Sequence, residues 1–154
     1  MIQYCFDTMI VINLHRQFPR DVWPSVWARV EGIVEAGRAF LPRQVLIELE
    51  RVDDDCAPWC RNFQGFVVEA EADEIELVAR IARVHGDWVT PRHNDADPWL
   101  VAHAVARGRQ LVTAERMKGT GTADRNLKIP NIAAEFGATS LDFNALARQE
   151  GWSF

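Results

Sequence analysis

Residues 94–115, NDADPWLVAHAVARGRQLVTAE, decide the fold because they combine a buried helix with the strand that follows it. Residues 97–106 begin with an acid and are apolar around most of the helical circumference, which is typical of a helix buried on several sides. Gly108 is a natural end for that helix, and the apolar residues 110–113 predict a short strand. Glu115 lies just past the carboxyl end of this strand, where ligands gather in open α/β sheets.

Asp97 has two interpretations when it is considered alone. Asp is a preferred N-cap residue and Pro is favoured directly after it, so Asp97 followed by Pro98 is consistent with a helix cap. If Asp95 caps the helix instead, Asp97 falls in the first turn and its carboxylate is free for chemistry. This stretch does not decide between the two, so the choice depends on the other acids of the chain.

The rest of the chain predicts a single α/β domain. Residues 2–6 read as a buried, central strand that ends at Asp7, and residues 38–41 read as a second strand. Helices are expected at residues 9–14, 21–36, 44–53, 57–68, 72–85 and 144–150. A last strand is expected at residues 129–132, followed by a helical turn at 133–136. This alternation favours a mostly parallel sheet covered by helices over residues 1–154.

The composition is that of an ordinary globular protein and sets limits on function. The formal net charge of -5 does not indicate a nucleic-acid-binding protein, although a bound cation would cancel part of the charge of converging acids. No segment reaches the ~18 apolar residues needed to cross a membrane. The CAPWC segment at residues 56–60 is not a CxxC motif, so we expect no zinc site. We expect a reduced, cytoplasmic protein without a signal peptide.

Acids stand at the ends of elements that a parallel sheet would bring together. Asp7 follows the first strand, Asp97 and Glu115 flank the buried helix and its strand, and the helix at residues 44–53 offers Glu48 or Glu50. Carboxylates that converge without basic partners repel one another, and a divalent cation resolves this repulsion. Oxygen ligands favour Mg²⁺ or Mn²⁺, and such centres cut phosphodiesters by activating water.

Residues 116–128 form a Gly/Thr-rich segment that also carries basic side chains. Its spacing does not match the GxxxxGK[ST] phosphate loop. It is either a flexible surface loop or a loop that contacts phosphate beside the acids, with Arg116 and Lys118 as the contacting residues.

On these residues the sequence resembles the PIN-domain nucleases, most closely the VapC-like toxin ribonucleases. The matching segments cover nearly the whole chain: Asp7-Thr8, Glu48-Leu49, Asp97 ahead of residues 100–104 (LVAHA), and residues 111–115 (LVTAE). The resemblance implies a three-layer α/β/α sandwich and a Mg²⁺- or Mn²⁺-dependent endoribonuclease that hydrolyses RNA. It also selects Glu48 over Glu50, and it implies a toxin neutralised by a cognate antitoxin protein.

The resemblance assigns the residues of the expected site. Metal-binding and catalytic roles fall on Asp7, Glu48, Asp97 and Glu115. Substrate contacts are expected from Thr8, Thr113, Arg116 and Lys118. The expected partners are RNA, the antitoxin and, in a homodimer, a second copy of the chain. Glu115 departs from the family, in which the last acid is commonly Asp or Asn, and Pro98 is also atypical, so we interpret the chain as a divergent PIN-like branch.

Two other functions are compatible with the sequence. A small-molecule phosphohydrolase of the HAD or receiver type also has an Asp after its first strand, but the HAD DxD pattern is absent after Asp7. A non-catalytic PIN-like module for protein binding would not need all four acids. The helix at residues 21–36 carries Trp23 and Trp27, for which we favour core packing over a groove for a partner.

Overall fold

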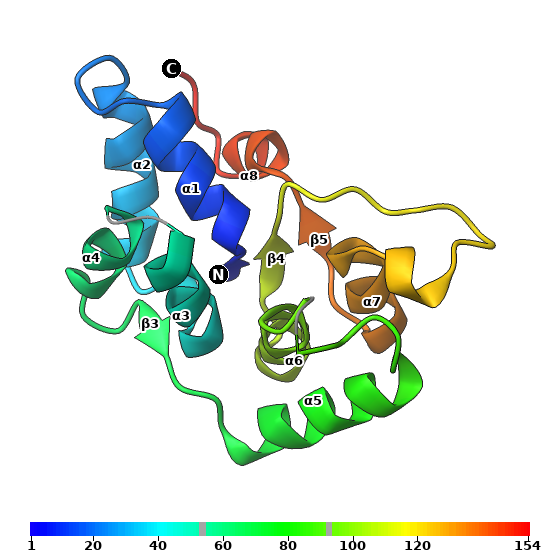
Figure 1. Ribbon diagram of the computed structural model, residues 1–154. Coiled ribbons are helices and arrows are strands. Elements are labelled where there is room, and N and C mark those ends of the chain that lie inside the picture. The colour runs from blue at the N-terminus through cyan, green and yellow to red at the C-terminus, as the bar shows by residue number, and fades with distance from the viewer. Residues whose placement is uncertain (53–54, 92–93) are drawn as a thin grey trace.

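The computed structural model describes residues 1–52, 55–91 and 94–154, which form an alternating series of strands and helices (Figure 1). The strands are β1 (Tyr4–Phe6), β2 (Ala39–Pro42), β3 (Val67–Val68), β4 (Gln110–Val112) and β5 (Ser140–Leu141). The helices are α1 (Thr8–Gln17), α2 (Pro24–Glu35), α3 (Arg43–Val52), α4 (Cys56–Arg61), α5 (Ala72–Val84), α6 (Asp97–Arg107), α7 (Ile129–Phe136) and α8 (Phe143–Gln149), with a 3₁₀ turn η1 (Asp124–Asn126).

The five strands form one parallel sheet with β1 at its centre. Their order is β3-β2-β1-β4-β5, and every adjacent pair is parallel. The chain moves outward from β1 through β2 to β3, and then returns across the sheet to β4 on the other side of β1. The order therefore reverses between β1 and β4, where Phe6 is the register partner of Val112. In open α/β sheets this reversal creates a crevice at the carboxyl ends of the strands.

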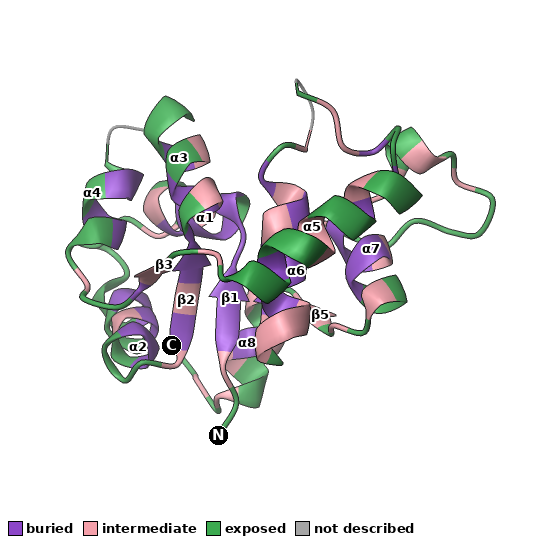
Figure 2. Ribbon diagram, turned by 90° about the horizontal axis from the view of Figure 1, so that it is seen from below, coloured by how far each residue is buried: buried purple, intermediate pink, exposed green. Residues whose placement is uncertain are grey.

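Helices cover both faces of the sheet, which gives the three-layer α/β/α sandwich expected from the sequence. Figures 1 and 2 show α1 to α4 gathered on one side of the strands and α5 to α7 on the other. Helix α6 packs against β1, β2 and β4, and α5 covers it from outside. The buried residues of α6 include Leu100, Val101, Ala102 and Ala104, as its apolar sequence predicts.

Two expected elements are wrong. Residues 57–68 do not form one helix: α4 ends at Arg61, Gly65 takes a left-handed conformation at φ 82°, and β3 then pairs with β2. The strand expected at residues 129–132 is the start of helix α7, which has Pro130 in its first turn, a position that favours helix initiation. The last strand is β5, which follows the left-handed Gly137.

Within the described residues, no helix is both long and apolar enough to span a membrane. Cys5, Cys56 and Cys60 are buried, and none of them forms a disulfide. Trp27 lies in the core, where its indole ring packs edge-on against Trp59, whereas Trp23 remains largely exposed.

Candidate metal centre

Asp7 lies at the carboxyl end of the central strand, and both of its carboxylate oxygens are held. Its backbone N–H donates to the carbonyl of Val112 across 3.0 Å, which fixes it beside the end of β4. One carboxylate oxygen accepts the backbone N–H of Thr8 at 2.7 Å, and the other accepts the hydroxyl of Thr113 at 2.8 Å. Asp7 is also the N-cap residue of α1.

Asp97 is not a helix cap. It is the first residue of α6, the N-cap position is occupied by Ala96, and no side chain caps this helix. Asp95 does not cap α6 either, because its carboxylate pairs with Arg51 at 3.3 Å near the surface. Among the described residues, the Asp97 carboxylate has neither a hydrogen-bond donor nor an ion-pair partner. This is the arrangement in which the Asp97 carboxylate is available for chemistry.

The turn before α6 aims Asp97 into the crevice. Asn94 has a φ of 56° and is the only non-glycine residue in this left-handed region within the described chain. Asn tolerates the conformation better than most residues, and the Asn94 side-chain amide donates to the carbonyl of Trp88 at 3.0 Å. The carbonyl of Asn94 accepts the N–H of Asp97, so the turn is held on both sides.

Glu48 and Glu50 point to different surroundings, although both lie on α3. Glu48 is half-buried and hydrogen-bonded to the side chain of Thr8. Burial raises the pKa of Glu48, and the charges of Asp95 and Glu115 raise it further. Glu50 is exposed and pairs with Arg61 of α4 at 3.4 Å. The structure therefore brings Glu48, and not Glu50, to the other acids.

Glu115 is fixed between β4 and the first turn of α7. Its backbone N–H donates to the hydroxyl of Thr113 at 3.1 Å. One carboxylate oxygen accepts the N–H of Ile129, the first residue of α7, at 2.8 Å. Helix N-termini favour negative charge, so this contact anchors the carboxylate. The extra methylene of Glu relative to Asp gives the side chain the reach for this contact.

The electrostatics of the cluster are those of acids without a counter-ion. Burial raises the pKa of Asp97 to about 8, and the charges of Asp7, Glu115 and Glu48 act in the same direction. Burial also raises the pKa of Asp7 to about 7, an effect that the hydrogen bond from Thr113 opposes. The Glu115 charge adds to the rise at Asp7. Acids that perturb one another in this way gain from a cation, and their oxygen ligands suit Mg²⁺ or Mn²⁺.

The four side chains do not yet form a closed ligand cage. No three of Asp7, Glu48, Asp97 and Glu115 place one oxygen each within 4.8 Å of the others. Shared coordination of one ion therefore requires side-chain rotation, and no hydrogen bond or ion pair to its carboxylate opposes rotation of Asp97 within the described residues.

A second acidic group in the described chain has a basic partner within the protein. Glu71, Asp73 and Glu74 bring one carboxylate oxygen each within 4.8 Å of the others at the start of α5. The Arg107 guanidinium contacts all three, at 2.7, 2.5 and 3.4 Å, and His103 bonds to Glu74 at 2.6 Å. We interpret this group as an ion-pair cluster that joins α5 to α6.

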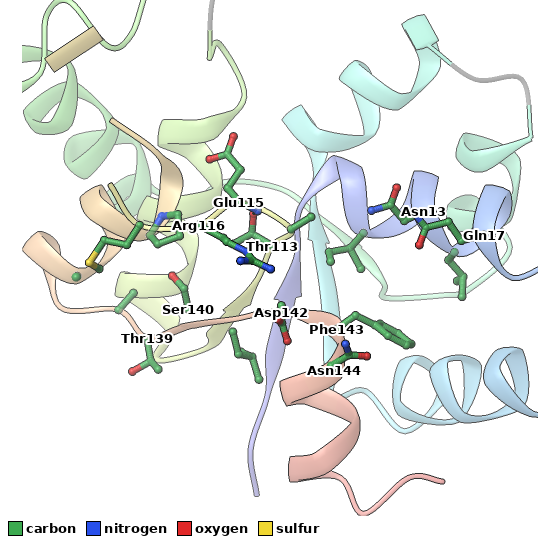
Figure 3. A pocket seen from close by; sticks show the side chains of 18 of the residues that line it. Asn13, Gln17, Thr113, Glu115, Arg116, Thr139, Ser140, Asp142, Phe143 and Asn144 are labelled. Carbon is green, nitrogen blue, oxygen red and sulfur yellow. The ribbon is translucent and has the colours of Figure 1, made fainter. Parts of the chain in front are cut away.

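The expected substrate-contact residues fall into two groups. Thr8 and Thr113 are buried and orient the acids. Arg116 and Lys118 are exposed in the loop after β4, and the Lys118 backbone is tied to Asn131 of α7 by two hydrogen bonds. Arg116 lines a pocket of about 830 Å³ beside the acids (Figure 3). This pocket could not be predicted from the sequence, because its polar side chains on α1 and α8 have the pattern of ordinary solvated helix residues.

The fold and this site define an α/β/α sandwich with an acidic centre at the carboxyl edge of its sheet. The chain belongs to the family described as domain of unknown function DUF4411, whose model matches residues 4–154. Among solved structures, the crystal structure of PAE2754 from Pyrobaculum aerophilum is similar over 97% of each chain, with a TM-score of 0.51 and 14% identity. At this identity the likeness concerns the fold alone. No curated protein matches the chain significantly.

Proposed function

We propose that this protein is a Mg²⁺- or Mn²⁺-dependent endoribonuclease of the PIN-domain type, related to the VapC-like toxins. The observation that supports this proposal most is the convergence of acids from separate elements at the strand-order reversal. Asp97 is half-buried there among other acids, with no cationic partner in the described chain. Such a set of carboxylates suits a divalent cation and phosphodiester hydrolysis.

Asp7, Glu48 and Asp97 would hold the ion, and Glu115 would position a water molecule or take part in a second ion site. When bound, the ion would activate water for attack on the phosphodiester and stabilise the charge of the departing oxygen. The expected products carry 5′-phosphate and 3′-hydroxyl ends.

The polar groups around the acids would fix their orientation during the reaction. The Thr113 hydroxyl donates to Asp7 and accepts the N–H of Glu115, so it sets the relative placement of two acids. The contact between Glu115 and the N–H of Ile129 leaves the second Glu115 oxygen to accept a proton from water. Thr8 performs the same orienting role for Glu48.

The test of this function is cleavage of RNA in the presence of Mg²⁺, Mn²⁺ or EDTA. Structured and single-stranded RNA should both be offered, and Asp97→Asn should abolish cleavage by the purified protein. Asp21→Asn is the matched control, because Asp21 is exposed and is not one of the four acids of the proposed centre. Cleavage that survives EDTA would exclude the metal mechanism. Hydrolysis of p-nitrophenyl phosphate without RNA cleavage would favour a small-molecule phosphohydrolase. If the wild-type protein shows neither activity, a binding module is favoured.

The toxin role extends the proposal to a protein partner and to action in the cytoplasm. Expression of the active protein should slow growth, and co-expression of the neighbouring reading frame should relieve the arrest if it encodes the antitoxin. Asp97→Asn serves as the inactive control. If the active protein never slows growth and no neighbour copurifies with it, the toxin role is wrong even where RNA is cleaved.

A further inference from the structure

A pocket of about 830 Å³ opens directly beside the acidic centre (Figure 3). Its walls come from α1, the loop after β4, the first half of α7, and the segment from β5 into α8. Thr113 and Glu115 belong both to the pocket wall and to the acidic centre. A molecule in this pocket would therefore lie next to the group that reacts at the acids. The volume is within the range of sites that take small organic ligands, which is about 300–1,000 Å³.

The polar side chains of the pocket carry few internal hydrogen bonds. Asn13 and Gln17 project from α1, and Asn144 faces the pocket from α8 (Figure 3). None of these three amides has a side-chain hydrogen bond within the described chain. The hydroxyl of Ser140, also in the wall, is buried without a hydrogen-bond partner. A buried hydroxyl without a partner is unusual.

The chemistry of these groups matches a nucleotide. A side-chain amide presents a donor and an acceptor side by side, as the edge of an unpaired base requires. Phe143 lines the pocket and supplies an apolar aromatic surface, with its ring centroid 5.7 Å from that of Phe18. Arg116 lies in the same wall without an ion-pair partner among the described residues, and its planar guanidinium suits a phosphate.

We propose that this pocket binds the base and sugar of a single unpaired nucleotide adjacent to the phosphate that reacts at the acidic centre. This inference deepens the proposed ribonuclease function and rests on it. An unpaired nucleotide fits better than a duplex, because pairing occupies the Watson–Crick edge of a base and keeps the base stacked in the helix. The net charge of -5 points the same way, since it offers no general attraction for a long phosphate backbone. Recognition of one base in a pocket requires few basic side chains.

The direct test measures nucleotide binding without catalysis. The four nucleoside 5′-monophosphates and ribose 5-phosphate are titrated into the protein in EDTA and followed by NMR or calorimetry. At least one nucleotide should bind about tenfold more tightly than ribose 5-phosphate, which is the discrimination expected from one good bidentate base contact. Equal binding of ribose 5-phosphate and all four nucleotides would overturn the base pocket. The absence of binding by any nucleotide would overturn it as well.

Variants of two pocket residues test whether the nucleotide binds in this pocket. Asn13→Ala with Asn144→Ala removes two amides, and Ala is favourable in the helices that carry them. This double variant should lose the roughly tenfold preference for a base. Asn62→Ala, an exposed Asn outside the pocket, should keep its affinities within about twofold of the wild type. A double variant that keeps the preference would contradict the proposal.

Cleavage of single-stranded oligoribonucleotides separates this inference from the proposed function. In Mn²⁺ the wild type should prefer one base beside the cleaved bond, and the double variant should cleave with a flatter preference. If Asp97→Asn abolishes cleavage while the double variant keeps the full preference, the ribonuclease proposal stands and the pocket inference is wrong. If nucleotides bind in the pocket and no RNA is cleaved, the pocket is a nucleotide site and the ribonuclease proposal is wrong. The inference would also be overturned if the pocket binds neither nucleotides nor oligoribonucleotides and is instead covered by a copurifying protein.

Discussion

The hydroxyl of Thr113 donates to the carboxylate of Asp7 across 2.8 Å and so joins the carboxyl ends of β4 and β1. These are the two strands between which the strand order reverses. The same hydroxyl accepts the backbone N–H of Glu115, so one buried side chain orients acids on both sides of the crevice. The placement of Asp7 and Glu115 therefore depends on Thr113, which is not itself one of the proposed metal ligands.

Thr113→Val tests this relationship with almost no change in volume. The substitution leaves one Asp7 oxygen buried without its donor, which should lower the free energy of unfolding by about 1–3 kcal/mol at pH 8 in EDTA. It should also weaken the stabilisation by Mn²⁺, because Asp7 loses its orientation. Chemical denaturation with and without Mn²⁺ measures both effects. Thr120→Val, at an exposed position, is the control, and equal behaviour of the two variants would exclude an orienting role for Thr113.

The stability of the metal-free protein should fall as the pH rises. Burial raises the pKa of Asp7 from 3.8 to about 7 and that of Asp97 from 3.8 to about 8. The folded protein thus binds these protons more tightly than the unfolded chain, and this stabilisation is lost as the pH rises through the folded pKa values. Melting in EDTA between about pH 5 and 9 should show the decline, and Mn²⁺ should reverse it at high pH because it binds the ionised carboxylates. A flat profile in EDTA would show that the pKa values of Asp7 and Asp97 are not raised in the folded protein.

Asp97→Asn should stabilise the protein in EDTA at pH 9, where Asp97 is ionised because the pH lies above its pKa of about 8, and it should reduce the response to metal. Removing one of several like charges should raise the free energy of unfolding by roughly 0.5–2 kcal/mol at an effective dielectric near ~20. For a chain of this size, each kcal/mol corresponds to about 2–4 °C in melting temperature. The gain in melting temperature on adding Mn²⁺ should shrink, because that gain follows the affinity of the folded state for the ion. Wild type and variant that melt together in EDTA and gain equally from Mn²⁺ would refute the site.

The elements around the acids could be predicted because local signals at their ends are strong. Asp7 ends an apolar run and caps the next helix, and Gly108 ends α6 in a left-handed conformation. Because β1 and β4 are parallel neighbours, the residues that follow them lie at the same edge of the sheet. The local pattern could not decide whether Asp97 caps α6. That outcome depends on Ala96 occupying the cap position and on Arg51 pairing with Asp95.

Short strands and helix orientation were harder to predict for physical reasons. Strands β3 and β5 have two residues each, too few for an alternating pattern, and they form only because a neighbouring strand offers its edge. In α5 the apolar Ile75 is exposed, whereas the charged Glu74 is buried. Glu74 gains its place through the hydrogen bond with His103, a tertiary contact that periodicity does not contain.

Glu48→Gln and Glu50→Gln form a matched pair that tests the choice between two acids of one helix. Glu48 bonds to Thr8 and is coupled to Glu115, so its loss should reduce metal-dependent RNA cleavage by about 10²-fold or more, as expected when a metal-positioning carboxylate is neutralised. Glu50 pairs with Arg61 at an exposed site, and an exposed ion pair is worth about 0–1 kcal/mol, so Glu50→Gln should fold and cleave like the wild type. Both variants remove one negative charge from α3, which excludes net charge as the cause of any difference. Rates measured at saturating and limiting Mn²⁺ separate lost metal affinity from lost catalysis. If the two variants lose activity equally, or if only Glu50→Gln is inactive, the acidic centre does not include Glu48 and the proposed ligand set is wrong.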